Sequence, residues 1–144
     1  MEPTRAGRPV CASATLPDAA WQECFNLSQA RLVAGRVAPA HDLLPRIKGL
    51  LGRSGLDPDQ GLWLAPCRQV HTLFMRFAID VVFLDRRLRV VKVCRRLGPW
   101  RLSPLCWRAA SALEMPAGAA AAVREGDQLA FRPGAAPAAE GMTQ

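Results

Sequence analysis

Short hydrophobic segments with brief connectors dominate the middle of the chain. Four of them, rich in Val, Ile, Leu and Phe, cover residues 61–65, 70–76, 79–85 and 89–95. Segments of this length and composition are typical of β-strands. A parallel return between neighbouring strands needs a crossover of about a dozen residues or more, so the short connectors predict that these strands pair antiparallel.

Further elements are expected on either side of this region. Residues 30–37 form a candidate first strand, and residues 111–115 and 128–131 form candidate later strands. The Ala-rich segment 118–123 predicts a short helical turn. Between residues 40 and 53, apolar side chains recur at intervals of three and four, which aligns them on one face of a helix: Leu43, Leu44, Ile47, Leu50 and Leu51.

These elements together predict a mainly β, or α+β, fold. We expect a small, barrel-like, strongly curved antiparallel sheet of about six strands, with one amphipathic helix and one short helical turn. Residues 27–132 would form this single domain. Residues 1–26 and 133–144 are expected to be disordered, because they offer few large apolar side chains to bury.

The lengths of the apolar runs and the pattern of cysteines indicate in which cellular compartment the protein is expected. No apolar run approaches the roughly 18 residues that a membrane-spanning helix needs, and residues 1–20 make a poor secretory signal. We therefore expect a cytoplasmic protein. The five cysteines are odd in number and irregular in spacing, which indicates thiols rather than a disulfide framework.

The chain carries a basic excess that is concentrated in one segment. It has 19 Lys and Arg residues against 12 Asp and Glu, a formal net charge of +7. Such an excess permits attraction to nucleic acid or to an anionic membrane surface without requiring either. Nearly all the basic residues are Arg, and with abundant Ala and Pro this is also the bias of a GC-rich genome. Residues 86–101 contain no acidic residue, and Trp100 and Trp107 lie at or near their end.

A second group of potentially reactive side chains, with a thiol, an imidazole, guanidinium groups and a carboxylate, lies between residues 67 and 80. A turn there would place Arg76 opposite Asp80 as a charge-assisted pair. One interpretation is a salt bridge that clamps a hairpin, a common cross-strand contact. The other is a polar ligand site built from His71, Arg76 and Asp80, in which His71 is the side chain that titrates near neutrality.

The same segment supplies a candidate thiol nucleophile. On a strand, Cys67 and His71 would share a face but lie about 13 Å apart, so the local sequence forms neither a thiolate–imidazole pair nor a metal pair. The chain has only one other histidine, His41, and no Cys-x-x-Cys motif. We predict no metal and no cofactor.

Six motifs resemble, in order, the pattern of one protein family. They are GLLGR (49–53), GLWLAPC (61–67), VHTLFMRFAIDVVFLD (70–85), RVVKV (89–93), PWRLSP (99–104) and LEMPAG (113–118). On these residues the chain is identified as a member of the domain of unknown function 192 family over about residues 27–131. The resemblance implies a small β-rich, barrel-like fold with helical excursions and no established activity.

The resemblance also singles out residues and two departures. It implies distinctive polar positions at His71, Thr72, Arg76, Asp80, Asp85 and Glu114, and distinctive glycines at Gly49, Gly61, Gly118 and Gly126. Ala78 stands where the family usually has Pro, and Leu88 stands where it usually has Gly after an acidic turn. A bulky residue would then occupy a position of positive φ, which predicts a changed turn type.

Three functional hypotheses follow from these residues. The favoured one is a non-catalytic binding or accessory domain whose polar groove takes a small anionic ligand or an extended peptide. Its site would contain His71, Thr72, Arg76 and Asp80, with Cys67, Asp85, Arg101 and Glu114 as secondary candidates. A hydrolase-like enzyme would use His71 with Cys67 or Asp80. A nucleic-acid-binding protein would use the Arg-rich segment 86–101. The oligomeric state and any protein partner are left open.

Overall fold

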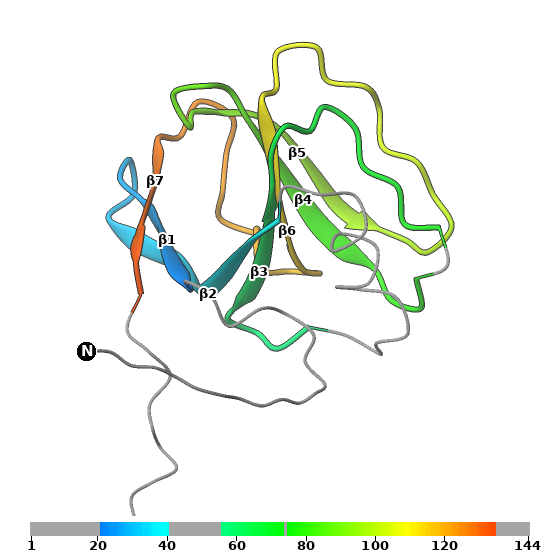
Figure 1. Cartoon of the computed structure of the whole chain (residues 1–144), viewed down its shortest axis with the longest axis horizontal. Helices are drawn as coiled ribbons and strands as arrows, with labels where there is room; N and C mark the ends of the chain where they lie inside the picture. The colour runs from blue at the N-terminus through cyan, green and yellow to red at the C-terminus, as the bar shows by residue number, and fades with distance from the viewer. Residues whose placement is uncertain (1–20, 41–55, 74, 135–144) are drawn as a thin grey trace, which may run out of the picture.

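A single curved sheet of seven strands forms the framework (Figure 1). The structure is a computed structural model that describes residues 21–40, 56–73 and 75–134. The sheet order is β5-β4-β6-β3-β2-β1-β7. The strands are β1 (Gln22–Asn26), β2 (Arg31–Ala40), β3 (Gln60–Leu64), β4 (Ile79–Leu84), β5 (Val90–Leu97), β6 (Ser111–Pro116) and β7 (Leu129–Pro133).

The sheet confirms the mainly β class and corrects several expected strands. Seven strands form in the described ranges, against the expected total of about six; β1 lies in a stretch that was expected to be disordered, whereas the candidate strand 70–76 is lost. The described residues of the segment 70–76 form no strand, and among them His71 makes an isolated bridge to Leu102. The β4–β5 hairpin is antiparallel as predicted. However, β2 and β3 pair in parallel, with Val37 opposite Gly61, because the long segment between them provides the crossover that short connectors cannot.

The predicted helices have two outcomes. The segment 118–123 forms successive turns instead of a helix, with bonds from Ala121 N to Gly118 O and from Val123 N to Ala120 O. Each of these bonds joins residues that are three positions apart, as in a 3₁₀-type turn, and the bonds do not continue into an α-helix. The amphipathic helix expected for residues 40–53 lies outside the described residues, except that Ala40 ends β2. Within the described ranges, no helix is long and apolar enough to cross a membrane.

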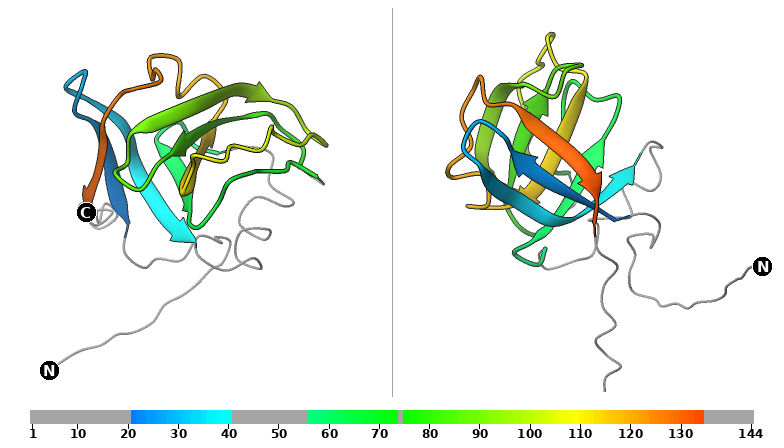
Figure 2. Two further views of the ribbon diagram at one scale, coloured as in Figure 1. Left: turned by 90° about the horizontal axis from the view of Figure 1, so that it is seen from above. Right: turned by 90° about the vertical axis from the view of Figure 1, so that its left-hand side faces the viewer.

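The sheet curls around one core and carries a second core on its outer face. Figure 2 shows the curl, with β1, β2 and β7 on one side and β4, β5 and β6 on the other. Along β4, Val82 and Leu84 join the inner cluster, whereas Ile79, Val81 and Phe83 join the outer cluster. Alternate residues of a strand point to opposite faces. Because both faces are covered, β4 is a nearly continuous apolar run.

The two edges of the sheet meet at one end and partly close the curl. Backbone bonds link β5 to the turn before β7, from Val90 N to Asp127 O at 2.9 Å and from Gly126 N to Val90 O at 2.8 Å. Leu129 N of β7 also donates to Leu88 O at 3.0 Å. These bonds satisfy edge groups that an open sheet would leave exposed. The result is a half-barrel that is closed at this end.

Asp80 fastens a loop to the opposite end of the half-barrel. Its side chain is 1% exposed. Oδ1 accepts a hydrogen bond from Arg96 N at 2.8 Å, and Oδ2 accepts from Gly118 N and Ala120 N at 2.9 Å each. Gly118 has a φ of +97°, which a residue with a Cβ adopts at a cost. The carboxylate therefore binds β5 and the 118–123 turns to β4.

We expect Asp80→Asn to destabilise the domain. The amide would direct N–H groups at backbone donors, so the free energy of unfolding should fall by about 2–4 kcal/mol in urea denaturation. Asp59→Asn is the matched control, because Asp59 is exposed and forms a surface ion pair with Arg36. That variant should lose less than about 1 kcal/mol. Equal losses in both variants would contradict a clamping role for Asp80.

Asp127 joins the β1–β2 turn to the turn before β7. Its Oδ2 accepts hydrogen bonds from Asn26 Nδ2 and Gln29 Nε2 at 2.8 Å each and from Arg124 N at 2.9 Å. Burial by itself raises the pKa of this carboxyl. The bonds from Asn26, Arg124 and Gln29 more than offset that effect, so the pKa lies below its ordinary value of 3.8.

This lowered pKa predicts a dependence of stability on acid. A carboxyl whose pKa is lower in the folded state adds stability above its unfolded-state pKa, and this contribution is lost as pH falls through the folded-state pKa. Asp127→Asn should lower the free energy of unfolding near neutral pH and flatten its decline below about pH 4. Urea denaturation over a pH series measures both effects. An unchanged acid slope, or the same change in the exposed-site control Glu125→Gln, would refute the assignment.

Candidate functional site

The ends of three neighbouring strands bring distant segments together. β6 lies between β3 and β4 and is antiparallel to both, with Ser111 opposite Leu84 and Ala112 opposite Leu64. The segment after β3, the segment after β4 and the segment before β6 therefore lie at the same end of these three strands. Ala110 N donates to Leu84 O at 2.7 Å, and Cys67 N donates to Ala110 O at 3.1 Å.

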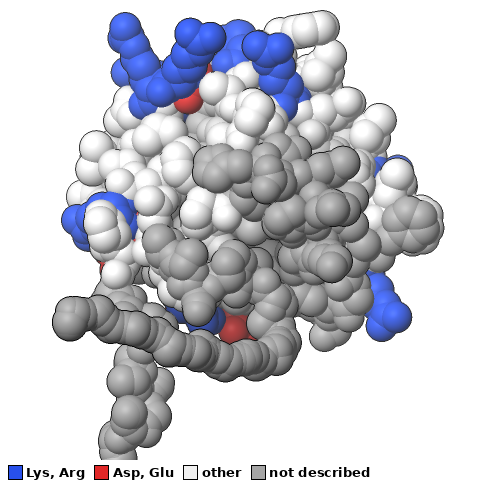
Figure 3. All heavy atoms as spheres, viewed as in Figure 1, with Lys and Arg blue, Asp and Glu red and all other residues white. Residues whose placement is uncertain are grey.

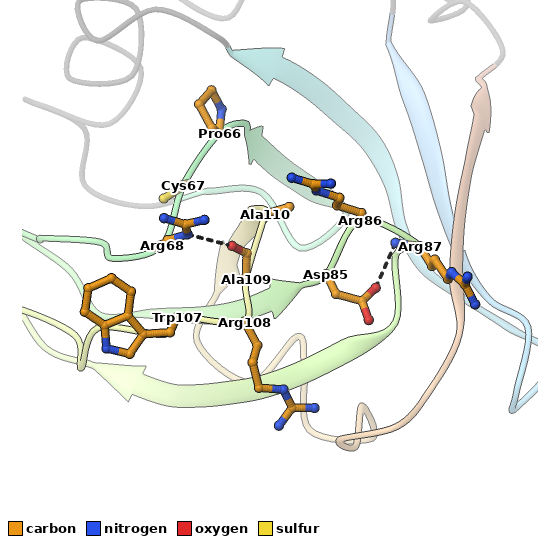
Figure 4. A pocket seen from close by; sticks show the side chains of 10 residues that line it. All are labelled: Pro66, Cys67, Arg68, Asp85, Arg86, Arg87, Trp107, Arg108, Ala109 and Ala110. Atoms are coloured by element: carbon orange, nitrogen blue, oxygen red, sulfur yellow. Dashed lines mark hydrogen bonds between the residues drawn. The ribbon is translucent and has the colours of Figure 1, made fainter.

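A hollow of about 770 Å³ lies between these three segments, and we call it the arginine groove. In Figure 4 the segment 107–110 runs between residues 66–68 on one side and the β4–β5 turn, residues 85–87, on the other. Its lining residues are Pro66, Cys67, Arg68, Asp85, Arg86, Arg87, Trp107, Arg108, Ala109 and Ala110.

The lining of the arginine groove is strongly basic. It contains four arginines and one carboxylate. Arg68 Nε donates to Ala109 O at 3.2 Å. The ion pairs found among the described residues involve none of Arg86, Arg87 and Arg108. Figure 3 shows Lys and Arg side chains gathered along the edge of the molecule that carries the β4–β5 turn in Figure 1.

The single carboxylate of the groove, Asp85, is engaged by the turn that it begins. Its Oδ1 accepts from Arg87 N at 2.8 Å and from Arg89 N at 2.9 Å. Leu88 has a φ of +66°, so a bulky residue does occupy the left-handed position expected from the sequence. This conformation closes the turn, with Leu88 N donating to Asp85 O at 3.0 Å. The turn thereby presents Arg86 and Arg87.

A pair of irregular segments, residues 66–78 and 98–110, runs beside the sheet, and we call it the arm. Backbone bonds join the two segments, including Thr72 N to Arg101 O, Ser103 N to Val70 O and Cys106 N to Arg68 O, all at 2.8 Å. Figure 1 shows both segments on the side of β4. The arm covers the outer face of the sheet through buried apolar residues: Cys67, Val70, Met75 and Ala109.

Thr72 lies at the centre of the arm and is fully buried. Its hydroxyl donates to Gly98 O and accepts from Arg101 N at 2.8 Å. The backbone carbonyl of Thr72 accepts from Trp100 N at 2.9 Å. This expected site residue therefore holds the turn 98–101, while the side chain of Arg101 is exposed.

The structure places Asp80 in a different environment from Arg76 and His71. Asp80 is buried and bound to backbone N–H groups, whereas Arg76 is exposed. The described residues show no ion pair between them, so the predicted hairpin clamp does not form. His71 is exposed, and its Nδ1 accepts from Leu73 N at 3.3 Å. The reason is that residues 70–76 leave the sheet instead of pairing with β4.

The secondary candidates divide between the groove and the core. Cys67 is 7% exposed and lines the groove together with Asp85. Cys67 Sγ donates to Gln69 O at 3.3 Å. Glu114 is buried in β6, between Leu62 of β3 and Val81 of β4. Over the ranges that the structure describes, no three His, Cys, Asp or Glu side chains form a group that could hold a metal ion.

Two groove residues, Arg68 and Arg108, were missed as candidates, and Trp107 had been noted only beside the Arg-rich segment. Arg86 and Arg87 had been assigned to a nucleic-acid hypothesis. The signal that could have found them is their position just beyond the ends of three buried strands, where functional side chains commonly lie on loops. Using that signal requires knowing that β6 inserts between β3 and β4.

Fold and groove define a small β-domain with a basic surface site. The chain belongs to the domain of unknown function 192 family, described as an uncharacterised ACR, whose model matches residues 26–131. That match confirms the resemblance found in the sequence. No curated protein matches the chain significantly.

Two solved structures share the fold. A protein of unknown function from Novosphingobium aromaticivorans DSM 12444 is 18% identical, with a TM-score of 0.65 over 85% of this chain and 99% of that chain. A Sinorhizobium meliloti 1021 protein described as a "putative transcription regulator" is 21% identical, with a TM-score of 0.62 over 78% of this chain and 92% of that chain. At these identities the likeness concerns the fold.

We expect Thr72→Val to loosen the arm. The substitution keeps the volume but leaves Arg101 N and Gly98 O without the hydroxyl, so stability should fall by about 1–3 kcal/mol. Backbone amide exchange should quicken most at Arg101. Thr72→Ser, which retains the hydroxyl, is the control and should keep Arg101 protected. If Arg101 exchanges equally fast in both variants, the hydroxyl does not hold the turn.

Proposed function

We propose that this domain binds an anionic ligand in the arginine groove. The observation that carries the proposal is the lining itself: among the described residues, four arginines from three segments line one hollow, and Asp85, the one carboxylate there, accepts backbone N–H groups. The proposal retains the anionic-ligand hypothesis drawn from the sequence but moves the site from His71, Arg76 and Asp80 to the end of β3, β4 and β6.

Charge and geometry both support an anion with phosphate or carboxylate groups. A guanidinium presents a planar fork of donors that matches these groups and forms two parallel hydrogen bonds with them. Arg68 lies on one wall and Arg86 on the other, so a ligand between them would contact both. The volume of about 770 Å³ falls within the roughly 300–1,000 Å³ that is typical of small-molecule sites.

The groove is less suited to catalysis by Cys67. A thiol nucleophile needs a general base within hydrogen-bond reach. His71, the base proposed from the sequence, is exposed on the arm and is not part of the groove lining. Asp80, which the sequence offered as the alternative partner of His71, accepts hydrogen bonds from backbone N–H groups at the other end of β4. These positions favour binding over a hydrolase-like reaction.

The distribution of arginines also favours a small anion over nucleic acid. Arg86 and Arg87 line the groove. Arg95, in the same basic segment, donates its side chain to the carbonyls of Ala120 and Val123 and so supports the 118–123 turns. A nucleic-acid site needs a continuous basic face along the strand. In the segment 86–101, by contrast, some arginines line the groove and Arg95 supports the fold.

Calorimetric titration with pyrophosphate and with citrate tests the proposal. The wild-type protein should bind at least one of them, and Arg86→Gln/Arg108→Gln should weaken that binding by about tenfold or more, because two charge-assisted contacts are lost. Raised salt should weaken it as well.

The matched control is Arg31→Gln/Arg124→Gln, which removes the same charge from exposed positions outside the groove. This variant should bind like the wild type. Equal weakening in both double variants would show attraction to the net charge alone, and absence of binding to both probes would overturn the proposal.

A further inference from the structure

The arm exposes an unusual amount of apolar surface. Of the seven large hydrophobic residues found exposed in the described part of the chain, five belong to the arm. They are Leu73, Trp100, Leu102, Leu105 and Trp107, with exposed fractions of 39%, 59%, 62%, 44% and 72%. Single exposed hydrophobic residues are common on proteins, whereas a concentration on one element marks an interaction surface.

The same element is purely basic. Segments 66–78 and 98–110 contain no Asp or Glu, and they carry four arginines that are exposed: Arg68, Arg76, Arg101 and Arg108. Most protein surfaces mix both signs of charge. A surface that combines Trp, Leu and Arg without any carboxylate is complementary to one that is apolar and anionic.

The arm presents these side chains on a fixed backbone. Bonds between its two segments and the buried hydroxyls of Thr72 and Ser103 hold residues 98–103 in place. Trp100 has a φ of +60°, a conformation that glycine would adopt with less strain. Its amide donates to Thr72 O at 2.9 Å. A strained tryptophan at an exposed turn indicates that the side chain itself has a role.

We propose that the arm docks on the surface of a lipid bilayer that contains anionic lipids. Tryptophan is favoured at the level of the headgroups, leucine side chains insert at the boundary with the acyl chains, and arginine binds the lipid phosphates. Nucleic acid would offer the leucines no apolar phase. A protein partner would have to match the arm's individual pattern of apolar and basic side chains, whereas an anionic bilayer offers both phosphates and an apolar phase across its whole surface. Trp100 and Leu102 lie outside the arginine groove, so this inference goes beyond anion binding there.

Co-sedimentation with vesicles tests the inference. The full chain should sediment with phosphatidylcholine vesicles that contain about one-third phosphatidylglycerol, and much less with phosphatidylcholine alone. Trp100→Ser/Leu102→Ser should lower the partition coefficient by about tenfold, because two large apolar contacts are lost. Arg76→Gln/Arg101→Gln should lower it on the anionic vesicles in particular.

Matched controls come from the other end of the sheet. Leu27→Ser/Leu32→Ser removes the two other exposed leucines, at 57% and 50% exposure. Arg31→Gln/Arg124→Gln removes the same charge as the arm variant. Both should sediment like the wild type. The inference is overturned if wild-type protein does not sediment with anionic vesicles, if the controls lose as much as the arm variants, or if the arm binds an oligonucleotide but not vesicles.

Discussion

The position of β6 between β3 and β4 is the constraint on which the groove depends. All the residues from Ser111 to Met115 are buried, with Ala112 in the outer core and Leu113 and Met115 in the inner core. A shift of register by one residue would exchange these faces and place Glu114 in the inner core, so the pairing is strongly specified. Once it is set, the chain that enters β6 must pass between the ends of β3 and β4. The arginines lie close together because β3 and β4 end, and β6 begins, at the same level of the sheet. In the chain these arginines are up to about 40 positions apart.

A sheet with two apolar faces explains the arm. The inner face closes on itself through β5 and β7, but the outer face of β3, β6 and β4 needs a separate cover. Irregular segments provide part of it here, and their backbone groups need partners because they lie against an apolar surface. Thr72 and Ser103 supply these partners from within the arm. Thr72 and Ser103 are buried in the arm, whereas its two tryptophans and Leu73, Leu102 and Leu105 lie at the surface.

The sequence predicted the local parts of this structure well. The β4–β5 hairpin follows from two apolar runs that flank a short turn beginning at Asp85, and the left-handed Leu88 was expected from the resemblance, in which Gly usually stands there. Non-local features were missed. No local sequence feature near β1 predicts its pairing with β7, in which Cys24 lies opposite Phe131, more than 100 residues away. Residues 70–76 look like a strand because alternate apolar residues also suit an arm packed on a sheet. The predicted Arg76–Asp80 pair does not form for the same reason, since it assumed that neighbouring segments pair.

The polar residues that identify the family and the charges that line the groove have different tasks. Thr72 and Asp80 are buried, and each binds backbone N–H groups of a loop that closes the fold. A resemblance built on such residues reports the architecture, which agrees with structural neighbours at only 18% and 21% identity. Arg86, Arg87 and Arg108 are exposed and carry none of that framework through their side chains. Exposed positions tolerate substitution with little effect on stability. The proposed anion site can therefore diverge while the half-barrel stays the same, and evidence for what it binds must come from these arginines and not from the shared motif.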